Sequence, residues 1–288
     1  MTDLLVVGSG PAGVSAAVYA LRAGLTVTML AKDGGALGKS DKIENYYGFD
    51  KPVSGTDLLE TGEKQAVRLG AQLVHDEVVG LSFNGNLIAA GLHGTYEVKA
   101  VILATGASRV TPPVPGLREF EGAGVSYCAV CDGFFYRGKD VAVFGNGQYA
   151  LHEAAELLPV AGSVTLLTDG APIPENLPEG LKADGRKLRA IEGDKTVAAA
   201  RFEDGEALPI AGIFIAVGVA GSDALARKLG ALTEGSRIIV DENMATNVPG
   251  LYAAGDCTGG LKQVVKAAHE GAVAGMSAAQ YIRSQKKA

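Results

Sequence analysis

The sequence is poor in cysteine, has no long apolar run and no excess of basic residues, and each shortage excludes a class of protein. Three cysteines in 288 residues are too few for the disulfide framework of small secreted domains. No apolar stretch approaches the roughly 18 residues that a membrane helix needs. A formal net charge of −6 argues against a general nucleic-acid binder, which needs clustered lysine and arginine. The first eight residues lack the basic segment of a signal peptide, so we expect a cytoplasmic protein.

Glycine, by contrast, is abundant. The chain has 40 glycines, which indicates many tight turns and many places where backbone approaches a ligand closely. With 47% hydrophobic and 20% charged residues, the composition is that of a soluble globular protein. A length of 288 residues leaves room for two domains of ordinary size.

One pattern occurs twice along the chain: a short apolar strand enters a glycine loop, and a helix and a second strand follow. In the first copy we expect a strand over 4–7, a helix over 14–23 and a strand over 25–30. In the second copy the expected elements cover 141–144, 151–158 and 163–167. Further strands are expected over 100–103, 212–217 and 251–256, and a long helix over 264–281.

This alternation predicts an α/β protein with two Rossmann-like, three-layer dinucleotide-binding domains. If the last strand and helix complete the first domain, the second domain is inserted in it. We therefore expect one domain over 1–115 plus 247–288 and another over 116–246.

The first glycine loop is Gly8-x-Gly10-x-x-Gly13. Its first glycine permits the turn, the second lets backbone approach a pyrophosphate, and the third lets the helix pack on the strand. The strand–loop–helix context favours a dinucleotide site over a ligand-free glycine turn. The acidic residue expected after the second strand is missing, because Ala31 stands there and Asp33 comes two residues late. We therefore expect backbone groups or Lys32 to hold the adenosine ribose.

The second glycine loop, Gly145-x-Gly147-x-x-Ala150, has the same form. Asp169 follows about 20 residues later, where a carboxylate accepts a hydrogen bond from a ribose 2′-hydroxyl and repels a 2′-phosphate. The pattern predicts a ligand with an unphosphorylated ADP half, such as NADH or a flavin dinucleotide; the alternative is an Asp-Gly turn in a vestigial site. The predicted residues of this second site are Gly145, Asn146, Gly147, Gln148, Tyr149 and Asp169.

Between the two loops lies Cys128-Ala-Val-Cys131-Asp132. Zinc is disfavoured as its partner, because Cys257 is remote and the four histidines lack zinc-ligand spacing, so no metal site is expected. Redox chemistry is favoured, because one thiolate can attack a disulfide and a second thiol can resolve the product. Asp132 then supplies or removes a proton, unless it is a solvated turn residue. We expect Cys257 to be a small buried residue.

Several segments together resemble the low-molecular-weight thioredoxin reductases, across nearly the whole chain. The likeness covers the active-site segment 125–139 (Val-Ser-Tyr-Cys-Ala-Val-Cys-Asp-Gly-Phe-Phe-Tyr-Arg-Gly-Lys) along its full length. It extends to 43–49 (Ile-Glu-Asn-Tyr-Tyr-Gly-Phe), 104–108, 254–256 and 263–268.

The resemblance implies an FAD-dependent disulfide oxidoreductase with FAD in the first domain. Asp256 would bond a ribityl or phosphate-side group, and Gln263 would lie near the flavin ring. The implied FAD-binding residues are Gly8, Gly10, Pro11, Ala12, Gly13, Lys32, Asn45, Thr105, Gly106, Gly255, Asp256, Lys262, Gln263 and Val264.

The same resemblance implies roles for the cysteine pair. Cys131 would face the flavin, Cys128 would attack the disulfide of a thioredoxin-like partner protein, and Asp132 would be the acid/base. It also implies a homodimer, and a second domain that rotates during turnover to expose the cysteine pair and admit the nicotinamide.

The chain departs from the family where NADPH is held. Family members that use NADPH carry a His-Arg-Arg-x-x-x-Arg cluster that clamps the 2′-phosphate. Here 168–174 reads Thr-Asp-Gly-Ala-Pro-Ile-Pro, and no arginine follows until Arg186. This resembles the pyridine-nucleotide-independent branches, in which reduced ferredoxin feeds the flavin or a second FAD occupies the nicotinamide site. Two alternatives stay open: an ordinary NADH- or NADPH-dependent thioredoxin reductase, and a flavoprotein redox sensor without sustained turnover.

Overall fold

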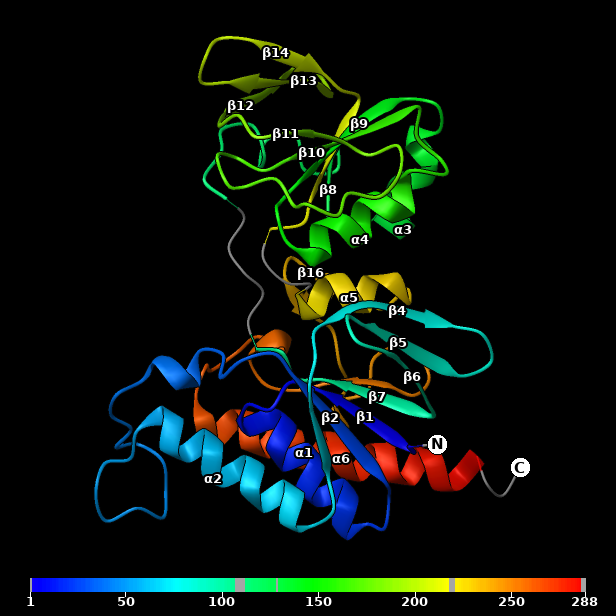
Figure 1. The fold of residues 1–288 in the computed structure, drawn as a ribbon. Helices are drawn as coiled ribbons and strands as arrows, with labels where there is room; N and C mark the ends of the chain where they lie inside the picture. The colour runs from blue at the N-terminus through cyan, green and yellow to red at the C-terminus, as the bar shows by residue number, and fades with distance from the viewer. Residues whose placement is uncertain (1, 107–111, 128, 218–220, 286–288) are drawn as a thin grey trace. The chain divides into compact units, whose positions relative to one another are not determined.

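The structure, a computed structural model, describes residues 2–106, 112–127, 129–217 and 221–285, without the side chains of Lys39, Val130 and Cys131. It divides into two compact units (Figure 1). The first unit combines two segments, Met1–Ser108 and Gly221–Ala288, and the second is the intervening segment, Arg109–Ala220. The second unit is therefore inserted in the first, as the sequence predicts.

The first unit is built on a parallel sheet of five strands. Their order is β18 (Leu251–Ala253), β7 (Ala100–Leu103), β1 (Leu4–Val7), β2 (Val27–Ala31) and β3 (Gln72–His75). Every neighbouring pair runs parallel. All residues of β1, β2 and β7 are buried, as expected of strands that are covered on both faces.

Two further layers cover this sheet. The helices α1 (Pro11–Arg22), α2 (Gly55–Arg68) and α6 (Val264–Gln285) lie on one face (Figure 1). The antiparallel strands β4 (Val78–Phe83), β5 (Leu87–Gly91) and β6 (Thr95–Val98) form the other layer. None of the helices in the described ranges is long and apolar enough to cross a membrane.

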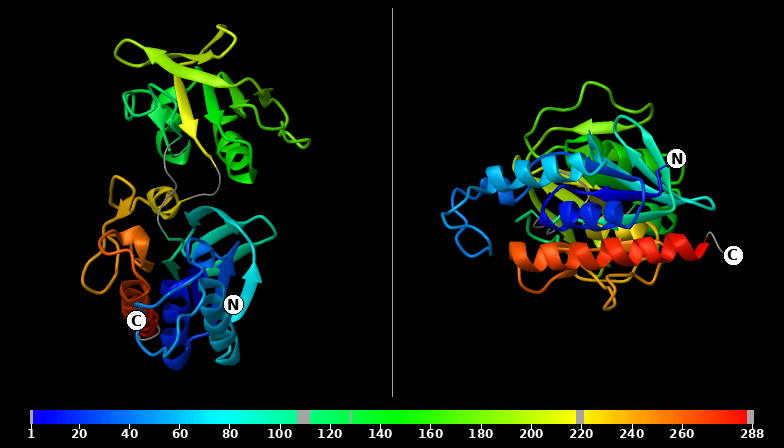
Figure 2. Two further views of the ribbon diagram at one scale, coloured as in Figure 1. Left: turned by 90° about the vertical axis from the view of Figure 1, so that its left-hand side faces the viewer. Right: turned by 90° about the horizontal axis from the view of Figure 1, so that it is seen from below.

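Helix α6 runs alongside α1 at very short range (Figure 2). A Cβ on Gly271 would lie 2.1 Å from the carbonyl oxygen of Ala12, and one on Gly275 would lie 2.4 Å from that of Ala16. Both positions therefore require glycine. This packing brings the start of α6 to the glycine loop that precedes α1.

The second unit repeats the plan. Its parallel sheet has the order β11 (Lys182–Asp184), β10 (Ser163–Leu167), β9 (Asp140–Phe144), β15 (Gly212–Ile215) and β8 (Val125–Ser126). One face carries α3 (Ala129–Asp132), the 3₁₀ helix η2 (Gly133–Tyr136) and α4 (Gln148–Leu157). The other carries antiparallel β12 (Leu188–Gly193), β13 (Val197–Phe202) and β14 (Ala207–Pro209). The predicted fold class, two three-layer α/β domains, is thus confirmed.

The ends of the compact units differ from the predicted domain boundaries at 115/116 and 246/247. The short elements α5 (Ser222–Lys228), β16 (Thr233–Glu234) and β17 (Arg237–Ile238) belong to the first unit. The reason is packing: α5 lies on β4, and β17 contacts both α5 and the 3₁₀ helix η3 (Asp256–Thr258). The antiparallel layers β4–β6 and β12–β14 are absent from the sequence-based prediction.

A buried carboxylate, Asp76, joins the end of β3 to the turn between β5 and β6. Its Oδ1 accepts hydrogen bonds from the backbone N–H groups of Glu77 at 2.8 Å and Leu92 at 2.9 Å, and contacts Nδ1 of His93 at 3.1 Å. Its Oδ2 accepts from the hydroxyl of Tyr96 at 3.0 Å. Burial by itself raises the pKa of Asp76, but these hydrogen bonds outweigh it, so the pKa lies below its ordinary value.

We expect Asp76→Asn to lower the free energy of unfolding by about 2–3 kcal/mol at pH 7, because an amide NH₂ cannot accept from these donors. A depressed pKa stabilises the fold above the unfolded-state value of about 3.9 and loses that contribution as pH falls through the folded-state value. The difference between wild type and variant should therefore shrink as pH drops from about 5 toward 3, in urea titrations at each pH. The exposed Asp194→Asn is the control, and a pH-independent difference would contradict the electrostatic explanation.

Candidate active site

The first glycine loop has the geometry that a phosphate-binding loop needs. A Cβ on Gly8 would lie 2.4 Å from the carbonyl oxygen of Ala104, and one on Gly13 would lie 1.9 Å from that of Gly8. In contrast, a Cβ on Gly10 would meet no atom within 4 Å. Gly10 also caps α1 without a side-chain hydrogen bond, so no capping side chain occupies the backbone N–H groups that follow Pro11 at the helix start. The loop therefore presents backbone donors to an anion.

A cleft of about 280 Å³ opens at this loop. It is lined by 8–12, 33–37, Ser40, 104–106, 254–256, 262–264 and Ala267. The segments 8–12, 33–37, 104–106 and 254–256 follow the carboxyl ends of β1, β2, β7 and β18, where open parallel sheets bind their ligands. The predicted FAD-binding residues that line it are Gly8, Gly10, Pro11, Ala12, Thr105, Gly106, Gly255, Asp256, Lys262, Gln263 and Val264.

Three predicted residues lie outside the lining. Gly13 is inside α1, where its role is the close contact with Gly8. The ammonium of Lys32 pairs with Glu77 at 2.7 Å. Asn45 donates a hydrogen bond from Nδ2 to Oε1 of Gln263 at 2.8 Å, so it supports a residue that lines the cleft.

Asp33, which the sequence placed too late for a ribose contact, does line the cleft. Its Oδ1 accepts from the N–H of Gly35 at 2.9 Å and shapes the loop after β2. The sequence signal was the pair Gly34-Gly35, which begins three residues after the strand. Asp33 therefore lines the cleft, whereas Lys32 does not.

The second glycine loop follows the same design between β9 and α4. A Cβ on Gly145 would lie 2.3 Å from the carbonyl oxygen of Ala216, and Gly147 caps α4 without a side-chain hydrogen bond. Asn146 and Gln148 lie at the loop and the helix start. Tyr149, however, is buried, and its hydroxyl donates to the carbonyl oxygen of Tyr127 at 3.4 Å. Its side chain therefore points into the unit.

Asp169 stands at the predicted place, after β10, with a left-handed φ of 52°. Its Oδ1 accepts from the N–H of Leu188 at 2.8 Å and so ties this turn to β12. The carboxylate therefore has a structural role besides any contact with a ribose. The aliphatic stem of Lys187 crosses the neighbouring Gly170, whose added Cβ would lie 3.0 Å from Cγ and Cε of the lysine.

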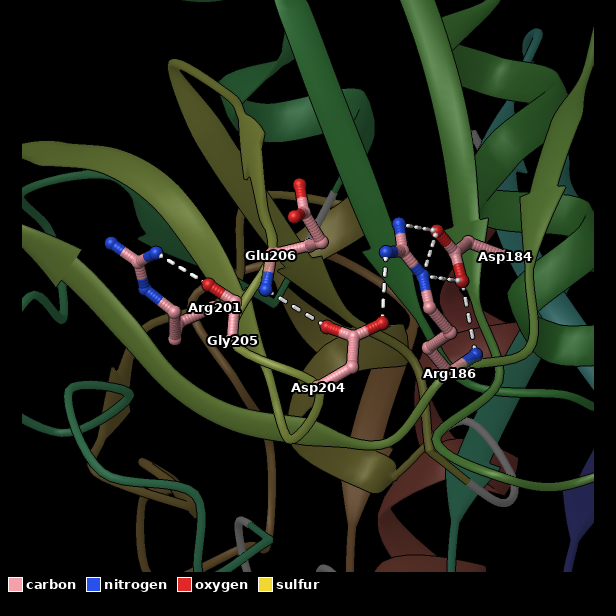
Figure 3. Close-up of polar contacts among 6 residues, drawn as sticks. All are labelled: Asp184, Arg186, Arg201, Asp204, Gly205 and Glu206. Carbon is pink, nitrogen blue, oxygen red and sulfur yellow. Dashed lines mark hydrogen bonds and ion pairs between the residues drawn. The ribbon is translucent and has the colours of Figure 1, made fainter.

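The first arginine after this loop is engaged by two carboxylates, as Figure 3 shows. Arg186 donates from Nε to Oδ1 of Asp184 at 3.0 Å and from Nη2 to Oδ2 at 2.6 Å, and its Nη1 lies 3.2 Å from Asp204. Its guanidinium also stacks over Phe202 at 3.9 Å from the ring centroid. The hydrogen bonds with Asp184 and, to a smaller extent, with Asp204 raise the pKa of Arg186. This cation is therefore already compensated.

Arg201 is held in a similar way at the β12–β13 hairpin. Its Nη2 donates to Glu192 at 2.8 Å. Its Nη1 donates to the carbonyl oxygen of Gly205 at 2.9 Å (Figure 3). Arg186 and Arg201 could therefore bind a phosphate only after these ion pairs are broken.

Of the segment 125–139, Cys128 and the side chain of Cys131 lie outside the described residues, whereas Ser126 and Asp132 are described. Asp132, at the end of α3, accepts from the hydroxyl of Ser126 at 2.6 Å. Burial and the Asp132 carboxylate together raise the pKa of Tyr136. Asp132 is thus held by a buried hydroxyl group at the carboxyl end of β8.

Glu153 on α4, only 1% exposed, accepts from the N–H of Ala129 at 2.8 Å. That N–H belongs to the peptide bond after Cys128. Sequence reasoning missed both Ser126 and Glu153. For Glu153, the available signal was an acidic residue on the apolar face of α4.

Cys257 is 1% exposed, with its sulfur 3.3 Å from the carbonyl oxygen of Ala254. Burial raises the pKa of its thiol to about 11, which disfavours the reactive thiolate. The prediction of a small buried cysteine is confirmed.

The chain also matches known proteins along nearly its full length. The model of the family "Pyridine nucleotide-disulphide oxidoreductase" matches residues 2–271. Thioredoxin reductase of Peptoclostridium acidaminophilum is 36% identical over 307 residues, covering 98% of this chain and 97% of that protein. Thioredoxin reductase of Aquifex aeolicus is 36% identical over 306 residues, covering 99% and 94%.

Two solved structures add to these relatives. The atypical thioredoxin reductase TRi from Desulfovibrio vulgaris Hildenborough has a TM-score of 0.92 at 39% identity and covers 99% of both chains. A ferredoxin-flavin thioredoxin reductase from Clostridium acetobutylicum has a TM-score of 0.72 at 30% identity and covers 98% of both. The chain therefore belongs to the pyridine nucleotide-disulphide oxidoreductase family and is a thioredoxin reductase-like flavin oxidoreductase with FAD as its cofactor.

Proposed function

We propose that this protein reduces the disulfide of a thioredoxin-like protein with the Cys128–Cys131 pair, using electrons that reach its FAD from a donor other than NADPH. The observation that carries the proposal is the combination of an open cofactor cleft at Gly8–Gly13 with a Cys-x-x-Cys segment whose aspartate is held by Ser126. The names of its relatives, thioredoxin reductases, support the substrate class.

The cleft residues fit FAD: Gly10 leaves room for the pyrophosphate, and Asp256 and Gln263 stand on the wall beyond it. Bound there, FAD would supply a carrier that accepts and delivers two electrons. The chain's own contribution is to bind the phosphates through backbone N–H groups at the start of α1 and to present Asp33 and Asp256 along the cleft.

The thiol chemistry is carried by the chain itself. The Cys128 thiolate attacks one sulfur of the partner's disulfide, forming a mixed disulfide and releasing one partner thiolate. The Cys131 thiolate then attacks the Cys128 sulfur, releases the second partner thiolate and closes the Cys128–Cys131 disulfide. Two protons finish on the partner's thiols, and Asp132 delivers one of them. Two electrons and two protons restore the dithiol.

Charged residues of the second unit argue against NADPH as the electron donor. A 2′-phosphate would meet the Asp169 carboxylate, and Arg186 is already paired with Asp184 and Asp204. We propose reduced ferredoxin as the donor, which the name of the Clostridium relative supports. A second FAD at the Gly145 loop is the other candidate, since that loop keeps the geometry of a phosphate site. We also propose a cytoplasmic homodimer, as the family resemblance implies.

The proposal is tested by mixing the protein anaerobically with reduced ferredoxin and oxidised thioredoxin and counting thioredoxin thiols. Two new thiols per thioredoxin and many turnovers per chain are expected. If the flavin is reduced but no new thioredoxin thiols form, the proposed disulfide reductase activity is refuted.

The FAD released by denaturing the same sample is measured and divided by the amount of protein. This ratio of FAD per chain distinguishes the two candidate donors. One FAD per chain fits ferredoxin alone, whereas two would favour the second FAD.

A further inference from the structure

The turn that carries Asp256 is held in an unusual conformation between β18 and α6. Gly255 has a φ of 88° and Gly259 a φ of 83°, both in the left-handed region, and the 3₁₀ helix η3 lies between them. Asp256 and Gly255 line the cleft. Within the turn the N–H groups of Thr258 and Gly259 donate to the carbonyl oxygens of Gly255 and Asp256 at 3.1 and 3.2 Å. Two side chains of α6 add further contacts to it.

Lys266, near the start of α6, contacts the Asp256 turn through its ammonium group. Its ammonium donates to the carbonyl oxygens of Gly255 at 2.8 Å and Gly259 at 2.6 Å, and contacts the hydroxyl of Thr258 at 2.9 Å. With the Glu270 carboxylate, which lies 2.9 Å from the ammonium, four oxygen atoms share its three protons. Both ends of the turn are therefore fastened to one side chain.

Glu270, four residues after Lys266 on α6, contacts the same turn through its Oε2 atom. Its Oε2 accepts from the N–H of Gly255 at 2.8 Å, lies 2.8 Å from the hydroxyl of Thr258, and pairs with the Lys266 ammonium at 2.9 Å. The two side chains are 17% and 13% exposed. The Glu60–Lys64 pair on α2 has the same i,i+4 spacing, but its lysine and glutamate are 76% and 58% exposed.

Val264, the first residue of α6, and Gln263 directly before the helix also line the cleft. The ion pair thus ties the turn that carries Asp256 to the first two turns of α6. Neither Lys266 nor Glu270 lines the cleft.

We propose that Lys266 and Glu270 are positioning residues for the cofactor. They hold the Asp256 carboxylate and the α6 terminus at the separation that bound FAD requires. The pair acts through the turn, without touching the cofactor. This goes beyond the proposed disulfide chemistry, and it rests only on FAD occupying the cleft.

The test compares FAD affinity among four variants of the full-length holoprotein. Glu270→Gln keeps the side-chain shape and removes the charge, and Lys266→Met removes the ammonium. Asp256→Asn is the positive reference, and Glu60→Gln on α2 is the matched control. Each holoprotein is diluted to nanomolar concentration, and the rise of free FAD fluorescence gives its Kd. Flavin absorption spectra and melting temperatures are recorded on the same samples.

We expect Lys266→Met to raise the Kd for FAD about 10- to 100-fold, because charged hydrogen bonds are lost and the partner carboxylate is left mostly buried. Glu270→Gln should raise it about tenfold and shift the bound flavin spectrum, with Glu60→Gln within twofold of wild type. A Kd within twofold of wild type for Glu270→Gln, alongside an effect of Asp256→Asn, would overturn the proposal. If Asp256→Asn is also without effect, the assignment of FAD to this cleft fails and the proposal fails with it. Glu270→Gln decides the question even if Lys266→Met does not fold.

Discussion

Cys128→Ser is expected to reduce thioredoxin reduction at least about a thousandfold while FAD stays bound. A serine hydroxyl is a far weaker nucleophile than a thiolate and cannot form the mixed disulfide. The cofactor cleft at Gly8–Gly13 belongs to the other compact unit and shares no residue with the cysteine segment. The measurement is steady-state thioredoxin reduction with reduced ferredoxin, together with the flavin absorbance of the purified variant.

The chain offers a matched control in Cys257→Ser. Cys257 is buried and its pKa is raised to about 11, so its removal should leave turnover within a fewfold of wild type. Cys131→Ser should instead trap a covalent adduct of Cys128 with the partner protein, visible by mass spectrometry and released by dithiothreitol. Full turnover in Cys128→Ser would refute the assigned nucleophile.

NADPH at micromolar concentration is expected to leave the flavin oxidised. The arginine cluster that the family resemblance associates with a 2′-phosphate clamp is absent from 168–174, and Asp169 adds a repulsive charge. Recruiting Arg186 would require breaking its pairs with Asp184 and Asp204. Losing two charged contacts of about 1.5–3 kcal/mol each lowers affinity at least about 100-fold.

Flavin absorbance is followed without oxygen after addition of NADPH and, separately, NADH, and dithionite then confirms that the flavin can be reduced. Bleaching by NADH alone would make this an NADH-dependent reductase, since only the 2′-phosphate is discriminated against. Prompt bleaching by NADPH would overturn the donor proposal. Lys187→Ala would then test whether the lysine across Gly170 has replaced the clamp.

The two glycine loops could be predicted because their function depends on neighbours in the sequence. A strand, a glycine turn and a helix follow one another within about 20 residues, so the pattern of Gly8, Gly10 and Gly13 already defines the local path of the chain. The structure has β1 at the predicted residues and α1 beginning slightly early, at Pro11, a favoured first helical residue. The cysteine motif and the lost arginine cluster are likewise local features.

Domain membership of 221–246 could not be predicted in this way. The helix α5 and the β16–β17 hairpin carry no strong pattern, and they join the first unit because α5 packs on β4, far away in the sequence. The antiparallel layers were missed for a related reason. Their strands are short and only partly buried, so hydrophobic alternation is weak.

By itself, the sequence determined the two dinucleotide-binding units, the family and the redox motif, because these depend on spacings of a few residues. Only the tertiary structure decided which charged groups remain available. It paired Arg186 with Asp204, placed Glu153 on the N–H after Cys128, and fastened the Asp256 turn to Lys266 and Glu270. Charge pairs and caps of this kind join different elements, and their geometry exists only after the sheets and helices have packed.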